Sequence, residues 1–117
     1  MSLTSERRRP ESSYQAFDLL CTLTAVLNFE GAVLFANAAL ENALGLSRRI
    51  LEGSDFAEYF VDPALLHKAM AGARGQDFAA LRFEASLHRH AKEPLPMQVI
   101  VSLAEGSEHV LLEMSPL

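Results

Sequence analysis

The sequence predicts an α+β domain with a five-stranded antiparallel sheet, short helices on one face of the sheet and an N-terminal helix. The first observation is the order of the patterns: two short strand segments, a helical region, and then three segments of alternating apolar and polar residues. The second is size, because 117 residues that are 50% hydrophobic can bury one core without help from a metal or a disulfide.

The N-terminal segment, residues 1–13, is polar and contains three consecutive arginines before a proline, so we expect a flexible, solvated tail. Residues 1–3 are typical of a cloning remnant. One domain is then expected over residues 14–117.

The first expected helix begins at a serine cap, either Ser12 or Ser13, and ends at Leu20. Its apolar residues recur at a spacing of three to four, which places them in one stripe on the helix: Tyr14, Phe17, and Leu20 or Cys21. The stripe needs a surface to cover.

A two-strand hairpin should follow, with strands over residues 24–29 and 32–36 and a turn in which Gly31 supplies positive φ. Asn37 comes next, and we interpret it as the structural pivot between strand and helix. Its side chain can accept backbone N–H groups as the N-cap of residues 38–44, which are rich in helix formers. A pure cap role predicts that Asn37→Asp is mild.

Short helices in series should then form one wall of the domain. Gly45 suits a left-handed helix end, Ser47 can cap the next turn, and Gly53 can close that turn before Ser54-Asp55 start another. Asp62-Pro63 is a strong helix start. The longer helix that begins there should end among residues 72–75 and bury Leu65, Leu66, Ala69, Met70 and Ala73.

Three strand segments complete the order. Over residues 78–89, alternation places one set of apolar side chains on the inner face: Leu81, Phe83, Ala85 and Leu87. We expect a turn over residues 91–96, and alternation then resumes at Met97, Val99, Val101 and Leu103. A link at residues 105–107 leads to the last strand, which contains Val110, Leu112 and Met114.

The central region resembles the core of a PAS domain, a resemblance that extends over about residues 14–117. The residues that carry it are Asn37-Ala38-Ala39, Glu41, Leu44-Gly45 and Gly53. Together with the C-terminal run over residues 110–117, they more narrowly resemble the N-terminal sensory PAS module of NtrB-type nitrogen-regulation sensor histidine kinases. The resemblance implies a homodimer, joined to the remainder of a kinase chain that responds to the signal protein PII.

Composition argues against several classes of partner. The net charge of −5 opposes the basic surface that a nucleic-acid binder needs. Because the sequence has neither a long apolar span nor a signal-peptide core, we expect a cytoplasmic location and no membrane contact. The single cysteine, Cys21, leaves no intramolecular disulfide and fits a reducing compartment.

We expect no cofactor and no metal. His88 and His90, with Glu84, could form a surface metal site on one side of a strand, but exposed strand faces often carry such residues. His67 lies where haem-binding PAS domains carry their axial ligand, but its polar neighbours indicate that it points to water. A flavin adduct needs a cysteine on the helical wall, and Cys21 lies before the first strand.

We also expect no catalytic residues in this chain. No histidine begins a His-Glu-x-x-Asn-Pro helix, and no phosphate-binding glycine loop or triad can be assembled from the residue spacing. A sensory module that is separate from its kinase parts would have this composition.

The concave side of the sheet presents two alternatives. It could hold an apolar ligand pocket lined by Phe35, Leu44, Phe56, Phe60, Leu66, Met70 and Phe83. Alternatively these side chains simply fill the core, which is the interpretation we favour.

The outer face of the sheet should carry an apolar remainder. If Val99 and Leu112 face the core, Ile100 and Leu111 face outward, together with Val26 or Leu27. We expect the N-terminal helix and a second copy of the chain to cover this face. The predicted dimer surface therefore consists of Tyr14, Phe17, Leu20, Ile100 and Leu111.

Three functions are compatible with these features. The first is the regulatory module of a cytoplasmic two-component sensor kinase in nitrogen regulation. The second is a PAS sensor of a small molecule in another kinase or transcription regulator. The third is a small conical-barrel enzyme, which lacks a visible acid/base pair here.

Overall fold

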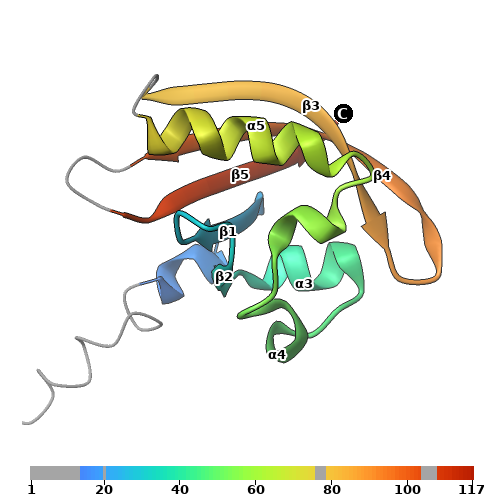
Figure 1. The fold of residues 1–117 in the computed structure, drawn as a ribbon. Coiled ribbons are helices and arrows are strands. Elements are labelled where there is room, and N and C mark those ends of the chain that lie inside the picture. Colours follow the sequence, from blue (N-terminus) through green and yellow to red (C-terminus); the bar gives the residue numbers. More distant parts are fainter. Residues whose placement is uncertain (1–13, 20, 76–78, 104–107) are drawn as a thin grey trace, which may run out of the picture.

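The computed structural model describes residues 14–19, 21–75, 79–103 and 108–117 (Figure 1). The elements are η1 (Gln15–Leu19), β1 (Leu23–Leu27), β2 (Val33–Ala36), α3 (Ala38–Leu44), α4 (Arg48–Leu51), η2 (Phe56–Tyr59), α5 (Pro63–Arg74), β3 (Ala80–Arg89), β4 (Lys92–Leu103) and β5 (Val110–Pro116). The predicted tail, the serine caps, Leu20, Phe78 and the link at residues 105–107 lie outside the described residues.

The five strands form one sheet in the order β2-β1-β5-β4-β3, and every neighbouring pair is antiparallel. The predicted α+β class and five-stranded sheet are confirmed. The helices α3, α4 and α5 and the 3-10 helix η2 lie against one face, where their buried side chains join those of the sheet in a single core (Figure 1). On the last two strands this core takes the alternate residues that the pattern predicted: Met97, Val99, Val101, Val110, Leu112 and Met114.

The first hairpin is shorter than predicted on its first strand, because β1 ends at Leu27. Asn28 forms the turn instead, since its Oδ1 accepts hydrogen bonds from the N–H groups of Glu30 and Ala32. Gly31 has a φ of 90°, the conformation predicted for it.

The turn expected over residues 91–96 is wrong, because β4 begins at Lys92 and the reversal is made at His90 and Ala91. Ala91 adopts a φ of 59° there. The prolines that suggested a longer turn are tolerated in the strand. Pro96 lies where the pairing of β4 with β5 ends. Its carbonyl accepts from Leu117 N–H, and at the end of the ladder the N–H that proline lacks is not needed to continue the pairing.

The prediction for the long helix is right in extent and wrong for one side chain. Leu66, Ala69, Met70 and Ala73 follow the i, i+3, i+4, i+7 spacing of one helix face and are at most 3% exposed. Leu65 lies about 100° around the helix from Leu66 and remains 36% exposed. This side chain faces the edge of the sheet rather than the core.

Candidate functional site

Five of the seven residues that were candidates for lining a ligand pocket lie in the hydrophobic core. Leu44, Phe56, Phe60, Leu66 and Met70 are each at most 3% exposed. The rings of Phe56 and Phe60 meet edge to face with centroids 5.7 Å apart, a favourable aromatic arrangement. These residues therefore form the hydrophobic core of the domain.

Phe35 does not belong with them, which corrects its place in the predicted pocket. It stands opposite Val26 in the first hairpin, and Val26 in turn stands opposite Leu111 of β5. Residues directly opposite each other share one face of a sheet, and Leu111 projects away from the core. All four residues of β2 are apolar, so alternation alone could not indicate which of them faces inward.

Phe35 and Val26 are instead buried beneath the N-terminal segment. The ring of Phe35 lies 5.8 Å from that of Tyr14 and 6.2 Å from that of Phe17, measured between centroids. Val26 is only 2% exposed. The residues Tyr14, Phe17, Val26 and Phe35 thus make a second, smaller apolar cluster on the outer face, which we call the outer cluster.

Tyr14 is fixed by a side-chain hydrogen bond between its hydroxyl and Nδ1 of His109. Burial raises the pKa of the Tyr14 phenol, so the hydroxyl keeps its proton and can donate to the imidazole. This bond attaches the start of the described chain to the segment that leads into β5.

Asn37 is completely buried and links three parts of the chain. Its Oδ1 accepts from the N–H groups of Leu40 and Thr24, both at 3.0 Å, so it caps α3 and holds β1. Its Nδ2 donates to the carbonyls of Phe17 and Thr22, both at 2.9 Å. Only an amide side chain of this size offers acceptor and donors together in this position.

The next cap differs from the prediction. Ser47 occupies the N-cap position of α4, but its side chain makes no capping hydrogen bond. The Arg48 N–H instead donates to Oε2 of Glu41 at 2.6 Å. Asp55 and Asp62 cap η2 and α5 as predicted, by accepting from the N–H groups of Ala57 and Ala64.

An ion-pair network joins the N-terminal segment to the helical wall. Arg48 Nη2 lies 2.9 Å from Asp18 Oδ1 and 3.4 Å from Glu41 Oε1, and its guanidinium carbon lies 5.0 Å from the centroid of the Phe35 ring. Asp18 Oδ1 also accepts from Ala38 N–H at 2.8 Å. The sequence contains no signal for this contact, because Asp18 and Arg48 are thirty positions apart and meet only through the fold.

We predict that Asp18→Ala lowers the free energy of unfolding by about 1–2 kcal/mol, because it removes both an acceptor at the start of α3 and a partly exposed ion pair. Asp18→Asn keeps an acceptor oxygen and should cost only about 0.5 kcal/mol. Urea unfolding measures both values. An Asp18→Ala variant that unfolds at the wild-type urea concentration would show that the network contributes no stability.

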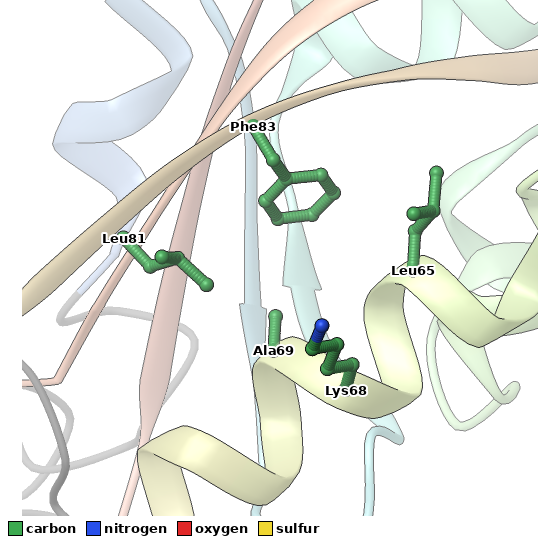
Figure 2. A pocket seen from close by; sticks show the side chains of 5 residues that line it. All are labelled: Leu65, Lys68, Ala69, Leu81 and Phe83. Carbon is green, nitrogen blue, oxygen red and sulfur yellow. The ribbon is translucent and has the colours of Figure 1, made fainter.

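An open apolar groove lies between α5 and the edge strand β3 (Figure 2). It has a volume of about 240 Å³ and is lined by Leu65, Lys68 and Ala69 of α5 and by Leu81 and Phe83 of β3. Leu65 and Leu81 are each 36% exposed, so two large hydrophobic side chains from different elements are exposed to solvent in the same groove. Of the predicted pocket residues, only Phe83 lines this groove.

The remaining candidates for chemistry are dispersed. His67 is exposed on α5, and Cys21 is exposed before β1. His88 lies in β3, but His90 lies in the turn beyond it, so the two do not share a strand face as expected. Within the described ranges, no cluster of three or more histidine, cysteine or acidic residues could hold a metal ion.

The helices in the described part of the chain are short, and the longest, α5, has 12 residues. None of those in the described part of the chain is long and apolar enough to cross a bilayer.

Comparison with known proteins gives a fold. No protein-family model and no curated protein matches the chain. Among solved structures, a PAS domain from a two-component sensor histidine kinase matches with a TM-score of 0.77 at 13% identity, covering 100% of both chains. The PAS domain of nitrogen regulation protein NR(II) from Vibrio parahaemolyticus matches with a TM-score of 0.66 at 20% identity, covering 90% of this chain and 95% of the other.

A third match is the PAS domain of the quorum-sensing receptor RpfR from Cronobacter turicensis in complex with BDSF. Its TM-score is 0.69 at 14% identity, with coverage of 84% of this chain and 95% of the other. These likenesses agree with the strand order and with the layer of helices on one face. The chain therefore has the PAS fold.

Proposed function

We propose that this chain is the sensory module of a two-component sensor histidine kinase that takes part in nitrogen regulation. The observation that carries the proposal is the end-to-end match with a sensor-kinase PAS domain. The likeness to the NR(II) domain supports the narrower assignment to nitrogen regulation. In this proposal the chain has no catalytic activity of its own, and its partners are a second copy, the remainder of the kinase and, through the full-length kinase, the signal protein PII.

We propose that the buried core side chains fill the interior, which fits a module that works through protein contacts. Ligand sites for drug-sized molecules usually have a volume of about 300–1,000 Å³ and are well enclosed. The groove between α5 and β3 is smaller, at about 240 Å³. A small-molecule sensor is the second candidate, favoured by this groove and by the RpfR domain that was solved with BDSF.

The coding sequence beyond Leu117 tests the assignment to a kinase. We expect a His-Glu-x-x-Asn-Pro helix followed by an ATP-binding domain, and autophosphorylation of the purified full-length protein. A DNA-binding or other output domain in that position would contradict the proposal.

Dimerisation is proposed to use the outer face of the sheet. Val26 and Phe35 are already buried within the outer cluster, so less apolar surface is left on this face of the sheet than the sequence suggested. Ile100 and Leu111 are half-buried on the same face, where Leu111 stands opposite Val26. A second copy that packs there would complete the cover of both side chains.

Sedimentation of two isoleucine variants tests this surface. Ile100→Asp should weaken the dimer by about tenfold or more, because a charge would replace an apolar contact in the interface. Ile50→Asp is the matched control, since Ile50 lies on α4 and is already 57% exposed. A wild-type protein that remains monomeric well above micromolar concentration would refute the dimer, and equal effects of both variants would refute this surface.

A further inference from the structure

The two edges of the sheet are protected unequally. Edge strands expose unpaired N–H and C=O groups that can pair with another chain, and proteins usually cover them. At the β2 edge, Val33 exchanges hydrogen bonds with the segment beside it: Gly53 N–H donates to its carbonyl at 2.8 Å, and its N–H donates to Ser54 O at 2.9 Å. The opposite edge, β3, is covered over only part of its length.

The covered part of β3 is its C-terminal half. Val61 N–H donates to Ser86 O at 2.9 Å, and Phe60 forms a bridge with Leu87. The stretch Ala80–Glu84 has no such partner among the described residues. It pairs with β4 in regular register, without a bulge or a proline, and so keeps an unbroken alternation of backbone groups along its outer edge.

The hydrogen bond at Ser86 identifies the groups that face the open edge. The N–H and C=O of one residue in an antiparallel strand point to the same side, and the side alternates along the chain. Since Ser86 points outward, Ala80, Arg82 and Glu84 also direct their backbone groups outward. Ala79 fits this alternation, because its carbonyl accepts from Leu103 N–H on the β4 side.

The open edge coincides with the groove. Leu81 and Phe83 project from this same stretch toward Leu65 and Lys68 of α5 (Figure 2). Arg82 and Glu84 are exposed on the opposite face of β3. A strand added at this edge would thus place alternate side chains against an apolar groove and against one positive and one negative charge.

From this coincidence we infer that Ala80–Glu84 is a docking edge for an extended peptide segment of a protein partner. The segment pairs antiparallel with β3. It carries an acidic residue opposite Arg82, a basic residue opposite Glu84, and aliphatic residues opposite Leu81 and Phe83. The inference deepens the proposed function, because it rests on the chain acting through protein contacts and names where one partner would bind.

A second copy of the chain fits this edge less well. A two-fold axis at Arg82 would place the two Arg82 side chains directly opposite each other, a repulsive pair. An axis at Phe83 would pair Arg82 with Glu84 of the partner favourably, but it would also bring Ala80 of one copy opposite Ser86 of the other. Ser86 already accepts from Val61 N–H. A separate peptide can end before that position, so the free backbone groups of Ala80, Arg82 and Glu84 can all be used.

The test uses the whole chain and the synthetic peptide acetyl-Ser-Lys-Val-Glu-Val-Thr-Ser-amide, which has the inferred pattern in antiparallel order. We expect saturable one-to-one binding. At saturation, the Arg82 and Glu84 amides should exchange their hydrogens about tenfold more slowly, while the Leu81 and Phe83 amides, which point toward β4, should change little. Protection of all four amides alike would overturn the inferred edge.

A peptide in which the two charged residues change places is the matched control. A peptide with its Glu and Lys interchanged has the same composition and should bind about fivefold more weakly. The double variant Arg82→Glu, Glu84→Arg should reverse that preference. Arg82→Pro should abolish binding, since the proline removes an outward N–H and no bond to β4.

Three further results would overturn the inference. They are the absence of saturable binding by either peptide, an unchanged preference in the double variant, and concentration-dependent protection of Arg82 and Glu84 without peptide, which would assign the edge to a second copy. Failure of the peptide to bind would leave the proposed function standing, because autophosphorylation and the effect of Ile100→Asp are measured separately.

Discussion

The substitution Asn37→Ala should lower the free energy of unfolding by about 3 kcal/mol, more than the usual loss of a helix cap. The side chain is fully buried and satisfies four backbone groups, in η1, before β1, in β1 and in α3. Alanine would leave all four without this partner. Urea unfolding followed by circular dichroism measures the change.

The structure revises the expectation for Asn37→Asp. Aspartate keeps the acceptor for Leu40 and Thr24 but loses the amide that donates to Phe17 O and Thr22 O. A carboxylate would then face two carbonyl oxygens, so we expect a loss of about 2 kcal/mol rather than a mild effect. Asn42→Ala, on the exposed side of α3, is the control and should change stability by less than about 0.5 kcal/mol. An Asn37→Asp variant as stable as wild type would show that the amide donors contribute little.

Phe56→Ala should lower the free energy of unfolding by about 3–5 kcal/mol, because it opens a cavity in a closed core. The ring is 0% exposed and contacts both Tyr59 and Phe60, with centroid distances of 5.7 Å in each case. Loss of the ring therefore removes contacts on several sides. The same urea experiment provides the value.

Phe83→Ala is the comparison for this prediction. Phe83 is only half-buried and lines the open groove, so its loss should cost about 1–2 kcal/mol. If Phe56→Ala were as mild as Phe83→Ala, the interior would contain space that the Phe56 ring does not fill. In that case the ligand-pocket alternative would regain support.

The fold could be predicted because its signals are local. Alternation over β4 and β5, the Asp62-Pro63 start of α5 and the Gly45 helix end each depend on a few neighbouring residues. The capping role of Asn37 was predictable for the same reason. Its two donor bonds were not, because they reach carbonyls fifteen and twenty positions away.

The candidate sites were harder to predict, because they depend on which elements become neighbours. Phe35 was placed on the wrong face since β2 is apolar throughout and its pairing with β1 shifts register between Val26 and Leu27. Leu65 and Leu81 look like core residues in their own segments. They remain exposed because β3 is an edge strand. The position of a strand within the sheet depends on how all five strands assemble, and not on the residues of that strand alone.

Native mass spectrometry of the freshly purified chain tests most directly the claim that the interior is filled and that the module acts through protein contacts. We predict the mass of the bare polypeptide and its dimer, without a bound small molecule, and an absorption spectrum without visible bands. A stoichiometric adduct that persists in the folded protein and is released on unfolding would contradict the account, because the core would then hold a ligand.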